Sequence, residues 1–218
     1  MSRLLFTSRH GGFSRNEYES FNLAKHVGDD AGVVERNREL LAKELGIDRS
    51  NLFFINQVHG ARVVEIDESS SYLQELDADA LFTRRSGVAL AVLTADCIPL
   101  LLSSPSAIAA VHIGRKGLIA GVLEATLEKF ESYGIASNQI SASLGASICG
   151  ICYQVSLEIY RQVVGQIEQC ATDESRRCLD LEAGVISILK DRAITWSSQG
   201  ECSKHSLGYF SFRRDNKT

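Results

Sequence analysis

The sequence has few of the features that mark membrane, secreted or multidomain proteins. Its 218 residues include only two prolines, Pro99 and Pro105, and no Pro-rich, Gly/Ser-rich or repeated segment divides the chain. No apolar run reaches the roughly 20 residues that a membrane-spanning helix needs. The first residues, MSRLLFTSRHGG, do not resemble a signal peptide. We therefore expect one domain over residues 1–218, in the cytoplasm and without a membrane partner.

An excess of positive charge is also absent. The formal net charge is −4 and the pI is about 5.8, whereas nucleic-acid-binding proteins usually carry a basic face. The only dense basic cluster, Arg213, Arg214 and Lys217, lies at the end of the chain and fits a solvated tail. The six cysteines are scattered, which favours reduced thiols over a disulfide framework. The composition therefore argues against a nucleic-acid partner and for a reducing compartment.

The hydrophobic pattern predicts an α/β fold of the mixed α+β type, with mixed β-sheets flanked by helices. Strands often follow one another directly, so a regular alternation of strands and helices does not fit. His59 and Gly60 are expected to form a turn between two paired strands. Asp30 is expected to cap the first helix and Gly46 to end it. The predicted strands are 4–8, 52–58, 62–66, 80–83, 88–94, 107–113, 140–148 and 209–214, and the predicted helices are 33–45, 118–132, 156–169 and 184–194.

Three residues with metal-binding side chains, His59, Cys97 and His112, lie at or just past the ends of predicted strands. Their spacing matches no zinc finger or ribbon, so a shared site would have to be assembled in space. Catalytic zinc sites use three protein ligands and leave a fourth position for water. However, a cysteine in an apolar strand usually packs as a small hydrophobic residue. The spacing alone leaves a metal site and a structural role open.

Acidic and cysteine residues elsewhere give weaker signals. Asp96 precedes Cys97 and is either a proton carrier or a buried structural acid. Strand alternation would place their side chains on opposite faces, with Pro99 ending the strand pairing. Asp77 and Asp79 could form a pair of acids, although polar residues before a strand need no function. Cys149 and Cys152 form a single CxxC without an evident second pair, so we expect them to pack structurally.

Basic and polar residues suggest an anion site. Arg9 lies in a flexible RHGG segment, and Arg115 and Lys116 open a predicted helix whose free N–H groups favour anions. Together with Asn22, they are our candidates for binding the substrate or phosphate.

Several motifs, in the same order along the whole chain, resemble those of the laccase-domain family. This family includes the YfiH-like and YlmD-like proteins, which are also called purine nucleoside phosphorylases or multicopper polyphenol oxidases. The resemblance implies a single-domain α/β fold with layered mixed sheets and a zinc site formed by His59, Cys97 and His112. It also implies phosphorolysis of adenosine, inosine, guanosine and 5′-methylthioadenosine, and deamination of adenosine. The matching segments are TSRHGGFS, FNLAKHVGDD, NQVHG, DADALFT, TADCIPL, AAVHIGRKGL and FSFRRD.

The chain also departs from the family pattern. It has HIGRKG over residues 112–117 where the family usually has HAGWRG, so a tryptophan is absent and Lys116 replaces an arginine. The usual GPxI appears as GASI over 145–148, and a C-terminal Gly-Arg is not present. These changes put phosphate handling in question.

The sequence leaves three hypotheses open besides a zinc nucleoside enzyme. A copper ion at the same ligands could give weak phenol oxidation. A true laccase does not fit, because five histidines are too few for the additional copper cluster and the only methionine is Met1. A metal-free hydrolase would use Cys97 as nucleophile and His112 as base. A non-catalytic binding protein could retain the fold. The oligomeric state is also open.

Overall fold

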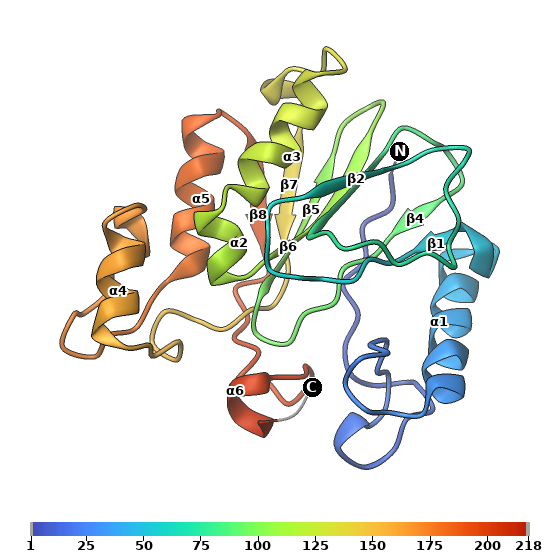
Figure 1. Ribbon diagram of the computed structural model, residues 1–218, viewed down its shortest axis with the longest axis horizontal. Coiled ribbons are helices and arrows are strands. Elements are labelled where there is room, and N and C mark those ends of the chain that lie inside the picture. The colour runs from blue at the N-terminus through green and yellow to red at the C-terminus, as the bar shows by residue number, and fades with distance from the viewer. Residues whose placement is uncertain (1, 217–218) are drawn as a thin grey trace.

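The computed structural model describes residues 2–216; Met1, Lys217 and Thr218, at the ends of the predicted domain, lie outside the described residues. A mixed sheet stands at the centre, and helices α2, α3, α4 and α5 lie to one side of it (Figure 1). Helix α1 lies on the other side, beside the short strands β1 and β4. The mixed α/β class predicted from the sequence is confirmed.

Helices, strands and short 3-10 turns alternate irregularly along the described residues. The helices are α1 Ala31–Leu45, α2 Arg115–Ile119, α3 Val122–Glu131, α4 Leu157–Val164, α5 Leu181–Asp191 and α6 Phe212–Asp215. The strands are β1 Leu52–Phe53, β2 Val63–Ile66, β3 Ala80–Thr83, β4 Ala89–Leu90, β5 Ile98–Ser103, β6 Ile108–Ile113, β7 Ser141–Leu144 and β8 Thr195–Ser198. The 3-10 turns occupy Asn16–Tyr18, Arg49–Asn51, Ser137–Gln139 and Glu168–Cys170.

The main sheet has six strands within the described residues, in the order β2-β3-β6-β5-β7-β8. The outer pairs β2–β3 and β7–β8 are parallel and the inner pairs are antiparallel. Strands β1 and β4 form a separate parallel pair. Strand β6 is almost wholly buried, as its continuous apolar sequence predicts for a central strand.

The two faces of the main sheet have different environments. On β5, Ile98, Leu100 and Leu102 are buried in the main core together with residues of the helices. The alternate residues, Pro99 and Leu101, line a large cleft instead. Two smaller apolar clusters support α1 and the β1–β4 pair. The sheet thus separates a packed helical layer from a cleft.

Local sequence signals explain the element ends that were predicted well. Asp30 caps α1 by accepting a hydrogen bond from the N–H of Val33, and Gly46 ends the helix with a φ of 74°. Strand β3 has the predicted bounds. The predicted helix 118–132 begins earlier and divides into α2 and α3 at Gly121, whose φ of 83° interrupts the helix.

Several predicted elements were wrong. Residues 4–8 form no strand, and 209–214 contain the helix α6 instead of a strand, because Ser211 caps the N–H of Arg214. Strands β1 and β2 do not pair with each other, so His59 and Gly60 link two sheets. Pro99 lies within the paired part of β5, opposite His112, and does not end the pairing. Strand β8 was not predicted. None of the described helices is long and apolar enough to cross a membrane.

Candidate metal centre

The three predicted ligands meet at one end of the main sheet. Cys97 directly precedes β5 and His112 lies near the end of β6, and these antiparallel neighbours place Ile98 beside Ile113. The link between β1 and β2 brings His59 to the same place. The ligand atoms of the three residues all lie within 4.8 Å of one another, and His59 Nε2 is 3.8 Å from Cys97 Sγ. The cluster therefore offers two imidazoles and one thiol to a single ion.

Asp79 organises both histidines. It is fully buried, and its Oδ1 lies 2.8 Å from His112 Nδ1. The same oxygen accepts the backbone N–H of His59 at 2.9 Å, and Oδ2 accepts that of Gly60 at 2.6 Å. A carboxylate at Nδ1 favours the tautomer that leaves Nε2 free for a metal. Asp79 thus orients one ligand through its ring and the other through its backbone, where His59 has a φ of 61°.

The electrostatic environment differs for the thiol and the imidazole. Burial, together with the nearby Asp96 and Asp79 carboxylates, raises the pKa of Cys97 to about 12. A bare Cys97 is therefore a protonated thiol at neutral pH, and a bound cation would supply the charge that a thiolate needs. Burial and the neighbouring His112, with Lys116 and Arg115, lower the pKa of His59. His59 is therefore neutral at physiological pH, as a metal ligand must be.

Burial also raises the pKa of the Asp79 carboxyl, but its hydrogen bonds outweigh this effect. His112 and the backbone N–H groups of Gly60 and His59 hold that pKa below its usual value. Asp79 therefore stays ionised at neutral pH, as the partner of a donating His112 ring requires.

Gly114 leaves room for the ligands. A Cβ at this position would lie 2.7 Å from His59 Cδ2 and 3.0 Å from Cys97 Sγ. The backbone φ is −88°, so the need for glycine comes from the close approach of the side chains and not from backbone strain. Helix α2 begins directly after Gly114 with the predicted anion-binding residues Arg115 and Lys116, which are not among the residues that line the cleft described below.

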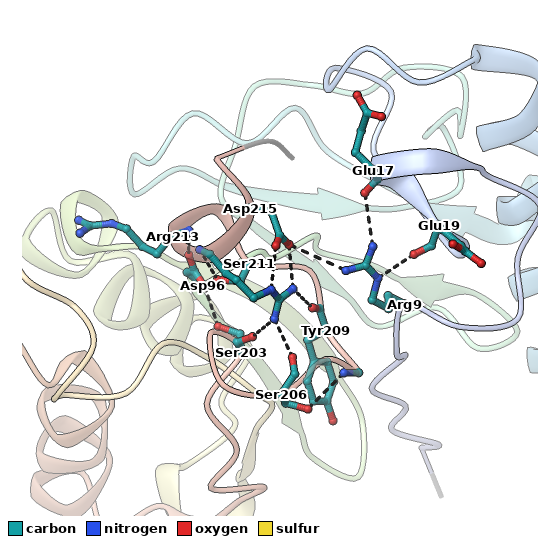
Figure 2. A network of polar contacts seen from close by, with 12 residues as sticks. Arg9, Glu17, Glu19, Asp96, Ser203, Ser206, Tyr209, Ser211, Arg213 and Asp215 are labelled. Atoms are coloured by element: carbon teal, nitrogen blue, oxygen red, sulfur yellow. Dashed lines mark hydrogen bonds and ion pairs between the residues drawn. The ribbon is translucent and has the colours of Figure 1, made fainter.

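Asp96 faces the C-terminal segment. Ser203 Oγ donates to its Oδ1 and the backbone N–H of Arg213 donates to its Oδ2, both at 2.7 Å (Figure 2). Asp96 is 8% exposed and has a φ of 92°, which is unusual for a residue other than glycine. These contacts favour a structural role for Asp96 over that of a proton carrier.

The other two predicted binding residues, Arg9 and Asn22, both have polar partners within the protein. Arg9 donates to the carbonyls of Glu17 and Glu19 and lies 3.9 Å from Asp215 (Figure 2). Asn22 is buried and bonds to Ala24 and Asp29. Both line the cleft, but their polar groups are already used by the protein.

The candidate metal centre opens into a large cleft with a volume of about 1610 Å³. His59, Cys97 and His112 all line it, together with aromatic Tyr153 and Phe210. Apolar walls with a few converging polar groups are typical of small-molecule sites. The cleft is large enough to hold a nucleoside.

Sequence reasoning missed two features. The sequence suggests Asp79 only as half of a pair with Asp77, yet Asp77 is exposed and bonds to Asn56 instead. Cys149 and Cys152 were expected to pack structurally, but they are only partly buried and lie beside Cys202 and His205. The spacing Cys202-x-x-His205 was the signal that could have indicated the second pair.

The fold and the two-histidine, one-cysteine cluster define a layered mixed α/β protein with a candidate metal centre at the sheet end. The chain belongs to the family described as multi-copper polyphenol oxidoreductase laccase, whose model matches residues 3–218.

Its relatives include a purine nucleoside phosphorylase of Streptomyces coelicolor, which is 42% identical over 98% of this chain and 90% of that protein. Another purine nucleoside phosphorylase, from Haemophilus influenzae, is 34% identical over 97% of this chain and 88% of its own length.

Two solved structures have the same fold. YlmD of Geobacillus stearothermophilus matches with a TM-score of 0.87 and 27% identity, over 97% of this chain and 86% of that one. A Neisseria meningitidis protein matches with a TM-score of 0.86 and 31% identity, over 96% and 87%. The resemblance read from the motifs is confirmed.

Proposed function

We propose that this protein is a cytoplasmic, zinc-dependent purine nucleoside enzyme whose main reaction is phosphorolysis. The convergence of His59, Cys97 and His112 at the wall of the cleft is the observation that carries the proposal. The relatives named purine nucleoside phosphorylase support the reaction class. The substrates would be adenosine, inosine, guanosine or 5′-methylthioadenosine, with inorganic phosphate.

The donor set fits zinc. Two nitrogen ligands and one sulfur ligand match catalytic zinc sites, which keep one position for water or substrate. When bound there, zinc would act as a Lewis acid and lower the pKa of a water molecule. Asp79 holds the His112 tautomer, and Gly114 keeps the ligands close together.

Phosphate needs positive charge near the sugar. Arg115 and Lys116 follow His112 by a few residues, and both lower the pKa of His59, so their charge reaches the metal centre. We assign phosphate binding first to these two residues. Arg9 and Asn22 are second candidates, because their polar groups already have protein partners.

Adenosine deamination is a second candidate activity, since a metal-activated water could attack the purine C6. It also requires a proton carrier for the leaving ammonia. Asp96 is the nearest acid in sequence to a ligand, but Ser203 and Arg213 hold its carboxylate. We therefore place deamination below phosphorolysis.

Copper-dependent oxidation and metal-free hydrolysis have less support. Copper can bind the same donors, and we expect at most slow phenol oxidation after copper loading. A metal-free hydrolase would require a reactive thiolate, whereas burial raises the pKa of Cys97 to about 12. The imidazole that contacts this sulfur, at 3.8 Å, is that of His59, while the hydrolase hypothesis requires His112 as the base.

The test is incubation of zinc-loaded protein with each nucleoside, with and without phosphate. Purine base and ribose 1-phosphate that form only with phosphate would support the proposal. Inosine formed from adenosine without phosphate would favour deamination, and no turnover of any nucleoside would favour a binding protein. Cys97→Ala should lose activity and the zinc that is bound at the cleft site.

Phosphate binding is tested by Arg115→Ala and Lys116→Ala. Removing one charge-assisted hydrogen bond costs about 1.5–3 kcal/mol, so each change should raise the KM for phosphate roughly tenfold to a hundredfold. Lys190→Ala removes an exposed cation on α5 and serves as the control. An unchanged phosphate KM in both test variants would refute the assignment.

A further inference from the structure

A second group of metal-binding side chains lies outside the site described above. Cys149, Cys152, Cys202 and His205 offer three sulfurs and one imidazole nitrogen, and these four atoms all lie within 4.8 Å of one another. Cys152 Sγ is 3.1 Å from His205 Nε2. All three cysteines are free thiols, and none belongs to the buried core.

The ligand spacing is that of two short clips, Cys-x-x-Cys and Cys-x-x-His, from distant parts of the chain. Each clip closes by a backbone hydrogen bond, from Cys152 N–H to the carbonyl of Cys149 and from His205 N–H to that of Cys202. Short clips of this kind provide ligand pairs in structural zinc sites. The backbone thus already holds Cys149 near Cys152, and Cys202 near His205, as two pairs of potential ligands.

The backbone joins the clips in register. Ser147 N–H donates to the carbonyl of Glu201, and Ser203 N–H donates to that of Ser147. The N–H of Cys149 donates to Cys202 Sγ at 3.4 Å. Hydrogen bonds to a sulfur stabilise its thiolate form, which is the form that binds metal.

We propose that Cys149, Cys152, Cys202 and His205 form a closed, tetrahedral zinc site with a structural role, distinct from the site in the cleft. Zinc bonds of about 2.3 Å to sulfur and 2.0–2.1 Å to nitrogen place tetrahedral ligands roughly 3.5–3.8 Å apart. The observed cluster reaches this spacing with small side-chain movements. Three thiolates and one imidazole are a common structural zinc set, and they leave no position for substrate.

A disulfide explains the arrangement less well. A bond between Cys149 and Cys152 would use two sulfurs and leave Cys202 and His205 without a reason to converge. An anion fits the four side chains less well, because three thiols and a neutral imidazole carry no positive charge. A cation accounts for all four side chains together.

The site would fasten the C-terminal segment to the rest of the fold. Residues 202–215 contain little regular structure apart from α6. Arg214 donates to the carbonyls of Ser203, Ser206 and Tyr209, and Arg213 donates to that of Gln154. A metal ion at Cys202 and His205 would hold the start of this segment, close to the Ser203–Asp96 contact (Figure 2).

The test uses Cys97→Ala as the parent protein, so that the cleft site is removed and the result does not depend on the proposed function. Protein purified without a His tag should contain about one zinc ion per chain. Adding Cys152→Ala should reduce zinc to background, whereas adding Cys170→Ala, a buried cysteine outside the cluster, should leave it unchanged. EDTA should lower the melting temperature of the parent by roughly 5–15 °C.

Cobalt provides a test on the folded parent itself. Cobalt added to the zinc-free Cys97→Ala protein should give the visible bands of a tetrahedral ion and strong thiolate charge-transfer absorption. His205→Ala should weaken cobalt binding, and His205→Cys should restore it with stronger charge transfer. The proposal is overturned if the parent contains no zinc and gives no tetrahedral cobalt bands, or if peptide mapping finds a stable disulfide among the three cysteines.

Discussion

Replacing Asp79 with asparagine tests how far the metal centre depends on one buried carboxylate. The change keeps the size of the side chain but removes its charge and one acceptor oxygen. Three donors point at the two oxygens: His112 Nδ1, the N–H of His59 and the N–H of Gly60, at 2.6–2.9 Å. An amide cannot accept from all three, because its NH2 group must face at least one of them.

Either orientation of the asparagine is costly. With the NH2 group toward Gly60, two donors face each other in a fully buried place. With the NH2 group toward His112, the ring must accept at Nδ1 and carry its proton on Nε2, where it no longer binds a metal. A lost charge-assisted hydrogen bond and a buried unsatisfied donor together cost about 3 kcal/mol. We expect zinc affinity to fall roughly 10- to 100-fold.

The assay is a zinc titration with a competing chelator, combined with thermal unfolding of the metal-free protein. A loss of about 3 kcal/mol corresponds to a decrease of roughly 6–12 °C in melting temperature for a chain of this size. Asp77→Asn is the control, because Asp77 is exposed and contacts neither histidine. If Asp79→Asn binds zinc as tightly as Asp77→Asn, the role assigned to this carboxylate is wrong.

The remaining predictions concern the same centre. Gly114→Ala should abolish zinc binding at the cleft site, because its Cβ would meet His59 and Cys97. Gly60→Ala should change zinc binding little, since its Cβ would lie 3.6 Å from Asp79 Oδ2. Isothermal titration of the two variants with zinc measures the difference. Zinc at the cleft site should hold at neutral pH and be lost as the pH falls through the lowered pKa of His59, because protons then compete with the metal. The same shift makes the folded state lose stability with falling pH, since the unfolded chain takes up the proton first. A pH titration of zinc at the cleft site measures this, and zinc that stays bound until the protein unfolds in acid would contradict it. Copper loading should produce only slow phenol oxidation, measured against the zinc-loaded protein, and a rapid four-electron reduction of oxygen would overturn the view that this chain is no true laccase.

The fold was predictable where a local signal controls the structure. The Asp30 cap, the Gly46 end and the short β-rich run of β3 depend on neighbouring residues alone. The predictions of secondary structure failed where contacts with residues distant in sequence determine the local structure. The YFSFRR segment alternates like a strand, but Asp96 accepts the N–H of Arg213 and Ser211 caps that of Arg214, so a short helix forms.

The site was predictable only in part and for different reasons. Spacing along the chain did not favour a metal site at His59, Cys97 and His112, and only the resemblance of three motifs suggested it. Asp79 carried no signal, since an acid before a strand is ordinary. Its role follows from the pairing of β3 with β6, which places Asp79 beside His112. Side-chain partners set by sheet order are not visible in a single sequence.

Asp96 links the two proposed metal sites through its backbone and its carboxylate. Its backbone carries the chain into Cys97, while its carboxylate holds Ser203, the residue after Cys202. The carbonyl of Asp96 also accepts the N–H of Ile148, which precedes Cys149. A φ of 92° costs roughly 1–3 kcal/mol and persists only where surrounding contacts impose it. These hydrogen bonds supply that constraint, so a metal that fastens Cys149 and Cys202 would also stabilise the turn that presents Cys97. The acid beside Cys97 therefore connects the candidate metal centre with the support of the C-terminal segment.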